Sequence, residues 1–201
     1  YESTSTPPPG GRLRYGMSQI LARQLEPRVI RDVSQIIAVS PAYIEALRNR
    51  YPDLEEDQCT VLPFGAPEKD FELLRELKPK QEIFEAAKGI QHWVYVGAAG
   101  LIMQSALRLL FSCIARLRTD DPSTWKNIRL HLAGTSYAPD GHGEKVVERI
   151  AKECGIADIV DEQTNRFPYF ETLQALTEAD ALLVIGSDAP SYTASKLYPY
   201  I

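Results

Sequence analysis

The sequence is poor in the features that define several protein classes. Its three cysteines, Cys59, Cys113 and Cys154, lie far apart and form no CxxC pair or Cys/His cluster, which argues against a disulfide scaffold or a zinc site and indicates reduced thiols. No apolar run approaches the roughly 20 residues of a membrane-spanning helix, so none is predicted. Lys and Arg number 22 against 27 Asp and Glu. The resulting net charge of −5 argues against unaided binding to nucleic acid or to an anionic membrane.

Several catalytic signatures are absent as well. There is no complete GxGxxG, no P-loop GK[ST], no Ser–His–Asp spacing and no paired-carboxylate spacing, which makes a dinucleotide-dependent oxidoreductase the weakest hypothesis. What is present is an ordinary globular composition, 44% hydrophobic and 24% charged, over 201 residues. The chain begins at Tyr1 rather than Met and ends inside an expected helix from Ala194, so we expect a fragment of a longer protein.

Short apolar runs alternate with helical patterns along most of the chain. The alternation predicts a parallel sheet with helices on both faces, in an α/β, Rossmann-like fold. After their first residues, the strands at 35–39 and 180–185 are apolar, which is typical of strands buried on both faces. The expected strands are 35–39, 59–62, 92–96, 128–133, 159–160 and 180–185; the expected helices are 17–31, 42–50, 101–118, 144–154 and 169–178.

Composition also predicts the domain organisation. Residues 1–66 are expected to be the end of a partial α/β domain, with a flexible loop at 1–11 that is rich in Pro, Gly, Ser and Thr. The charged stretch 67–89 is expected to be a linker with helical pieces. Residues 90–201 form the second domain, truncated at its C-terminus. For the helices at 17–31 and 101–118 we expect the inward side chains to be Ile20, Leu21, Leu25, Val29, Ile102, Ala106, Leu109, Leu110, Cys113, Ile114 and Leu117.

Ligands of such sheets bind at the carboxyl ends of the strands, so residues just after strands are the candidates. Gly97-Ala98-Ala99-Gly100 is either a cradle for a diphosphate or a tight turn that needs small residues. Gly134 and Thr135 follow the next strand, where ordinary turn chemistry explains them equally well. In the stretch 186–196, Ser191, Thr193, Ser195 and Lys196 gather where a helix is expected to begin. A Lys there opposes the helix dipole, so an anion site is the favoured interpretation over a capping Ser or Thr beside a solvated Lys.

Several of these segments together resemble a known family. DVSQIIAVSPAYIEALRNRYP followed by TVLPFGAPEKDF resembles the interdomain junction of GT-B glycosyltransferases. WVYVGAAG, LHLAG and the stretch from DEQTNRFPYF to IGSD resemble their donor domain, in the same order. PSYTASKLYPYI resembles the donor-phosphate loop of the large retaining group often called group 1, a family-4-like branch.

The resemblance implies a transferase that moves a sugar from a nucleotide-diphosphate-sugar donor to a glycan, a lipid-linked or a small acceptor. It implies no metal or other cofactor, a cytoplasmic site that extends to the inner membrane face for lipid-linked acceptors, and peripheral membrane contact only through segments outside this sequence. The implied donor residues are Gly97, Gly100, Gly134, Thr135, Ser191, Thr193, Ser195 and Lys196, with Arg166, Phe167 and Tyr169 near the base.

The sequence departs from the family pattern at the expected phosphate site. Ala98, Ala99 and Leu101 stand where many members carry an Arg and a Lys, and Pro199 stands where many carry a ribose-binding Glu. Three alternatives therefore stay open: an active transferase of which this fragment alone is inactive, a catalytically inactive GT-B-like interaction module, and another nucleotide-sugar enzyme such as an epimerase.

Overall fold

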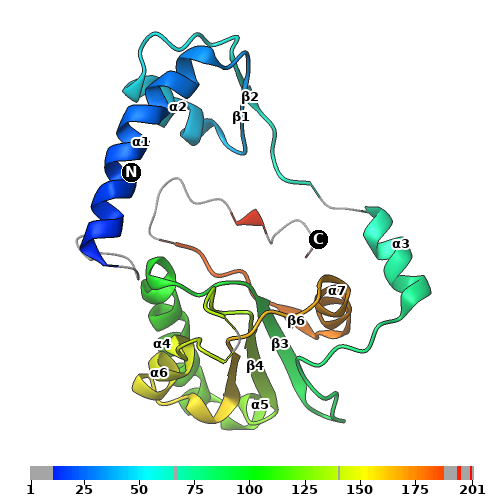
Figure 1. Cartoon of the computed structure of the whole chain (residues 1–201). Coiled ribbons are helices and arrows are strands. Elements are labelled where there is room, and N and C mark those ends of the chain that lie inside the picture. Colours follow the sequence, from blue (N-terminus) through cyan, green and yellow to red (C-terminus); the bar gives the residue numbers. More distant parts are fainter. Residues whose placement is uncertain (1–10, 66–67, 140, 188–193, 196–199, 201) are drawn as a thin grey trace. The chain divides into compact units, whose positions relative to one another are not determined.

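The computed structural model describes residues 11–65, 68–139, 141–187, 194–195 and 200. The chain divides into two compact units, residues 1–63 and 64–201 (Figure 1). Each unit is described by itself.

The first unit contains two helices and two short parallel strands. Its elements are α1 (Arg12–Asp32), β1 (Ile36–Ala38), α2 (Pro41–Arg50) and β2 (Cys59–Val61). The strands pair in parallel with Ile36 opposite Cys59. Helix α2 begins with Pro41, whose missing N–H costs nothing at the first helical position. All four elements were predicted, although α1 starts five residues earlier than expected.

Apolar side chains of the first unit are largely exposed. Ile20, Leu21, Leu25 and Val29, the expected inward face of α1, are all exposed. Strand β1 was expected to be buried on both faces, and this expectation is wrong because Ile37 is 64% exposed. The physical reason is that β1 has one neighbouring strand in a two-stranded sheet, and so small a sheet covers little of its own surface.

The second unit is a four-stranded parallel sheet with helices on both faces, as predicted. The strand order is β5-β4-β3-β6. The elements are α3 (Glu68–Leu77), β3 (Gln91–Val96), η1 (Leu101–Met103), α4 (Gln104–Asp120), α5 (Pro122–Trp125), β4 (Ile128–Ala133), α6 (Val146–Glu153), η2 (Ala157–Ile159), β5 (Val160–Gln163), α7 (Tyr169–Glu178) and β6 (Ala181–Leu182).

The sheet separates two apolar clusters. On one face, α4 and α6 pack on Tyr95, Leu130 and Leu132 (Figure 1). On the other, α3 and α7 contribute Leu74, Leu173 and Leu176 to a cluster with Val94 and Ala133. Helix α3 and the following segment, including Ile83 and Phe84, are therefore packed parts of the second unit, within the range expected to be a linker.

The inward face of α4 was predicted in part. Ile114 is buried as expected, and Ala106 and Leu110 pack against the same cluster. Leu107 and Phe111 are buried but were not predicted, whereas the predicted Ile102 of η1, Leu109 (68% exposed), Cys113 and Leu117 are exposed. The helix carries two apolar stripes at helical spacing, and the one containing the large Phe111 fills the space above the sheet.

Strand β6 is shorter and more exposed than the predicted strand over 180–185. It ends at Leu182, and among the residues after it Val184 is exposed while Ile185 is buried. The prediction of a strand buried on both sides is wrong here, because β6 pairs with β3 alone among the described strands and so lies at the edge of this sheet.

The strand order places a reversal of chain direction at β3. From β3 the chain moves through β4 to β5 on one side, and it then returns to place β6 on the other side of β3. Such a reversal opens a crevice at the carboxyl ends of the two strands that flank it. The turn that follows β3, Gly97–Gly100, lies at this position.

Candidate functional site

Two glycine turns lie side by side at the carboxyl ends of β3 and β4. Gly97 has φ 135° and Gly134 has φ 68°, backbone conformations that favour glycine. The Gly97 N–H donates to the Ala133 carbonyl at 2.9 Å, and the Gly134 N–H donates to the Gln163 carbonyl at 2.8 Å. The two amides thus extend the hydrogen bonding of the sheet by one residue. They fix the shape of the rim, by which we mean the edge of the sheet formed by the turns after β3 and β4.

The turn after β3 leaves a particular pair of amides available. The Ala99 N–H donates to the Thr135 carbonyl at 3.0 Å, and Tyr95 Oη donates to the Ala98 carbonyl at 2.8 Å. Within the described part of the chain, the N–H groups of Ala98 and Gly100 find no acceptor. Gly100 is exposed, and a Cβ built on it meets nothing within 4 Å, so the rim is open there. These two amides could donate to an anion that approaches η1 and α4.

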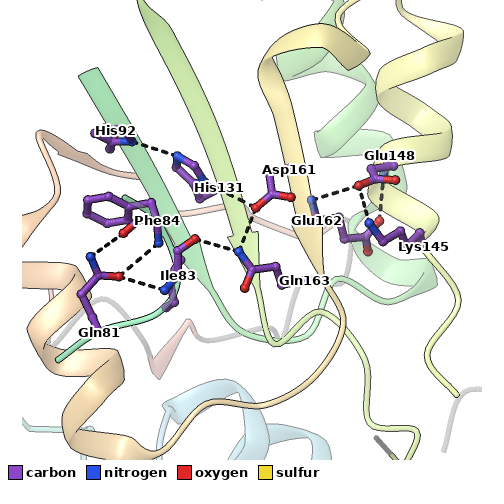
Figure 2. Close-up of polar contacts among 10 residues, drawn as sticks. All are labelled: Gln81, Ile83, Phe84, His92, His131, Lys145, Glu148, Asp161, Glu162 and Gln163. Carbon is purple, nitrogen blue, oxygen red and sulfur yellow. Dashed lines mark hydrogen bonds and ion pairs between the residues drawn. The ribbon is translucent and has the colours of Figure 1, made fainter. Parts of the chain in front are cut away.

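Thr135 is held by a buried carboxylate that the sequence reasoning missed. Its Oγ1 donates to Glu162 Oε1 at 2.6 Å. Glu162 Oε2 also accepts from the Glu148 N–H at 2.9 Å, and Figure 2 shows Glu162 beside Glu148. Glu162 is 1% exposed and Thr135 7%. Because Glu148 lies in the first turn of α6, the Glu162 carboxylate meets the positive end of that helix dipole. The Thr135 side chain therefore has a structural partner, and the amino end of α6 already holds an internal anion.

The three residues expected near a base lie in different environments. The Arg166 guanidinium stacks over the exposed Tyr137 ring at 4.5 Å. Phe167 packs against the apolar cluster of α3 and α7. Tyr169 Oη donates to Asp70 Oδ2 at 2.7 Å. Burial, with the Asp70 carboxylate as a second cause, raises the pKa of Tyr169 to about 12. Of the three, Arg166 is the one that supplies a cation to this part of the surface.

The C-terminal candidates are mostly not described. Ser191, Thr193 and Lys196 lie outside the described residues, as do Pro199 and most of the helix expected from Ala194. Ser195 is described and exposed.

The sequence analysis did not predict a role for Tyr200. This residue contacts the end of β3, the switch point at which the direction of the chain across the sheet reverses. Its Oη accepts from the Val96 N–H at 3.0 Å, and its ring packs in the cluster of α3 and α7. Burial raises the pKa of Tyr200 to about 12. The alternation of apolar residues gave no signal for this contact, because it joins positions 104 residues apart.

A buried histidine pair was missed as well. His131 is 8% exposed, and its Nε2 lies 3.0 Å from Nδ1 of His92. Both residues lie on the face of α7, away from the glycine turns. Among the described residues, no group of three or more His, Cys, Asp or Glu side chains could hold a metal ion.

Comparison with known proteins gives a consistent fold. No protein-family model matches the sequence, and no curated protein matches it. Solved structures do match with probability 1.00. WaaG, a glycosyltransferase involved in lipopolysaccharide biosynthesis, superposes with a TM-score of 0.59 at 15% identity over 94% of this chain and 48% of that chain.

Two further structures come from trehalose metabolism. A UDP-forming α,α-trehalose-phosphate synthase from Burkholderia xenovorans gives a TM-score of 0.52 at 11% identity, over 74% of this chain and 39% of that one. The N-terminal domain of Candida albicans trehalose-6-phosphate phosphatase gives 0.55 at 17% identity, over 90% of this chain and 43% of that one. The chain thus spans less than half the length of each.

The described helices include none that is both long enough and apolar enough to cross a membrane.

The predicted fold class is confirmed by these structural matches and by the parallel sheet of order β5-β4-β3-β6 with helices on both faces. The chain has the fold of the GT-B glycosyltransferases.

Proposed function

We propose that this chain supplies the donor-binding part of a glycosyltransferase, which transfers a sugar from a nucleotide-diphosphate sugar to a glycan, a lipid-linked or a small acceptor. The observation that carries the proposal is the position of the Gly97–Gly100 turn at the reversal point of the sheet. Ligands of open parallel sheets bind at that point. A cytoplasmic reaction, with acceptors at the inner face of the membrane, belongs to the same proposal.

The proposed role of the turn is to hold the leaving diphosphate. The amides of Ala98 and Gly100 would donate to its oxygens, and Arg166 with Lys196 would offset its charge. Ser191, Thr193 and Ser195 would supply hydroxyl donors. Fixed donors and cations that face developing negative charge lower the barrier to departure of such a group, so the proposal needs no metal ion. Acceptor positioning would come from the other domain of a two-domain protein.

Isothermal titration of the chain with UDP, GDP and ADP tests the proposal. We expect one of the three to bind, and Lys196→Ala to weaken that binding at least about tenfold, which is about 1.4 kcal/mol. The matched control is Lys152→Ala, which removes an exposed lysine from α6. If none of the three nucleotides binds to the folded chain, the proposal is wrong.

A second candidate is a GT-B-like module that binds other proteins and has lost catalysis. The favouring observation is that neutral residues, Ala98, Ala99 and Leu101, form the turn at the switch point, while the Gly97, Ala99 and Gly134 amides and the Thr135 hydroxyl already have partners. A chain that is folded by tryptophan fluorescence and binds no nucleoside diphosphate would favour this candidate.

A further inference from the structure

Two of the three histidines form a buried pair on the sheet. His92 and His131 come from β3 and β4, are 6% and 8% exposed, and join Nδ1 to Nε2 at 3.0 Å (Figure 2). His131 Nδ1 faces Asp161 Oδ2 at 3.6 Å. His92 Nε2 is buried and has no hydrogen-bond partner among the described residues. The pair lies five residues before Gly97 on β3 and three residues before Gly134 on β4, and it serves no step of the proposed transfer.

Residues 81–86, which we call the strap, cover this pair. Gln81 shapes the strap: its Nε2 donates to the Phe84 carbonyl at 2.7 Å, and its Oε1 accepts from the N–H groups of Ile83 and Phe84 (Figure 2). Gln163 Nε2 anchors the strap to β5 by donating to the Ile83 carbonyl at 2.7 Å. The Ile83 and Phe84 amides are also buried in the closed strap, so their protection from exchange with water reports whether the strap is closed.

Phe84 couples the strap to the histidines. Its ring stacks on His92 at 4.5 Å between centroids with an interplanar angle of 15°, and lies 5.4 Å from the ring of His131. The three rings form one stack, since the histidine rings are themselves 5.2 Å apart. A displacement of His92 therefore removes the surface on which Phe84 rests.

The number of protons on the pair decides whether its contact can exist. With one proton between the rings, His92 Nδ1–H donates to His131 Nε2, and His131 Nδ1–H faces the Asp161 carboxylate. One added proton still allows a donor to face an acceptor, because the ring that stays neutral can carry its proton on the nitrogen that points away from the pair. A second added proton makes both facing nitrogens donors at 3.0 Å and places two positively charged rings side by side. The rings then repel each other, and the hydrogen bond between them is lost.

Charged groups from each packed element surround the pair. Asp161 comes from β5, and Asp180 is the residue before β6, where its Oδ2 accepts from the His92 N–H at 2.7 Å. Arg129 of β4 donates to the carbonyls of Lys126 and Ile128. An open pocket of about 760 Å³ beside the strap adds Lys80, Glu82, Glu85 and Glu178 of α7. The carboxylates favour binding of the first added proton to the histidine pair. They do not relieve the repulsion that the second proton causes, because that repulsion acts directly between the two rings.

We infer that the His92–His131 pair is an acid-sensitive latch for the strap: the strap closes over the pair while at most one imidazole is charged, and it opens when both are. The latch is independent of what the glycine turns bind. Burial, and then the charge of His131, lower the pKa of His92 from 6.5. The open form, with His92 in water, takes up its proton near 6.5, whereas the closed form takes it up at lower pH. The closed form is therefore fully favoured above about pH 6.5, and the open population rises by up to about tenfold per pH unit below it.

Hydrogen exchange at the Ile83 and Phe84 amides tests the latch in the whole chain. Rates measured between about pH 7.5 and about pH 5 are corrected for intrinsic exchange and referred to the amides of β4. In the unchanged protein we expect exchange of the strap to accelerate by up to about tenfold per pH unit below about pH 6.5, and the β4 amides to stay protected. His92→Asn keeps an acceptor or donor near Nδ1 but cannot charge, so its strap exchange should be independent of pH. His142→Gln removes the third, exposed histidine and should leave the wild-type response.

Phe84→Leu provides the second test if His92→Asn fails to fold. Both histidines remain in this variant, so their imidazole resonances should still titrate. The strap amides should lose their pH dependence, because the stack that links them to His92 is gone. Wild-type strap exchange that does not change with pH, or an unchanged pH response in His92→Asn or in Phe84→Leu, would overturn the inference.

Discussion

Replacement of Glu162 by leucine should destabilise the second unit severely. The carboxylate is 1% exposed and accepts from Thr135 Oγ1 at 2.6 Å and from the Glu148 N–H at 2.9 Å. Leucine fills a similar volume but leaves the buried Thr135 hydroxyl and the partly buried Glu148 N–H without this acceptor. Each such donor costs about 1–3 kcal/mol, so the expected loss is about 2–6 kcal/mol. This is a large part of the roughly 5–15 kcal/mol that stabilises a typical domain.

Denaturant unfolding followed by tryptophan fluorescence measures this loss. The chain has two tryptophans, Trp93 and Trp125, which pack edge to face at 5.6 Å in the second unit, so the signal reports that unit alone. Glu153→Leu is the matched control. It removes a half-exposed carboxylate that pairs with Arg108 on the surface, and its cost should stay within about 1 kcal/mol.

A double-mutant cycle isolates the bond between Thr135 and Glu162. Thr135→Val alone should cost about 1.5–3 kcal/mol, because it removes a donor to a charged acceptor. In the Glu162→Leu background the hydroxyl has already lost its acceptor, so the same change should cost far less. If Glu162→Leu destabilises no more than Glu153→Leu, or if the two changes add, the carboxylate does not hold the rim in the way described.

Two further changes test the rim and its surroundings. Gly134→Ala should cost about 1–2 kcal/mol by the same fluorescence assay, because φ is 68° there, while the added Cβ meets the Asn165 carbonyl at an ordinary 3.9 Å; an unchanged stability would contradict the strain argument. Tyr169→Phe should remove one of the two phenols whose pKa is raised to about 12, seen as a smaller absorbance step near that pH, and should cost about 0.5–1.5 kcal/mol. Since the folded state keeps these protons, its stability should fall as pH rises from 10 towards 12, and less so in the variant.

The fold was predictable where a local pattern decides the structure. Strands β3, β4 and β6 lie in mostly apolar runs between helical patterns, so alternation alone indicated a parallel sheet. Strand β5 (Val160–Gln163) was predicted only as 159–160, because three of its four residues are polar. Ile128–Ala133 and Tyr169–Glu178 have the predicted bounds. The prediction failed where burial depends on neighbours: β1 and β6 have the composition of central strands but each pairs with a single partner.

The polar contacts near the site depend on register, which sequence patterns do not reveal. Val94 pairs with His131, and His131 pairs with Asp161, so the diagonal contact of His92 with His131 follows from a registration known only in three dimensions. The same holds for Thr135 and Glu162, which are 27 residues apart. The glycine turns, in contrast, could be found from the sequence. Gly97 and Gly134 have positive φ angles, and such angles favour glycine over other residues.

The edge of the sheet at the switch point explains how the glycine turn can be both fixed and open. Strand β6 stops early: the Leu183 N–H donates to the Val94 carbonyl at 2.8 Å, and two residues later along β3 the Val96 N–H is met by Tyr200 Oη instead of by a strand carbonyl. Tyr200 thus completes the pairing of β3 up to the residue before Gly97. From there the Gly97 and Ala99 amides are bonded to the β4 side, which leaves those of Ala98 and Gly100 without an acceptor among the described residues. The hydrogen bonds of the neighbouring amides hold the N–H groups of Ala98 and Gly100 in a fixed geometry. Binding of an anion to them therefore costs little conformational entropy of the loop. This preorganisation agrees with the proposed role of the turn in holding a diphosphate.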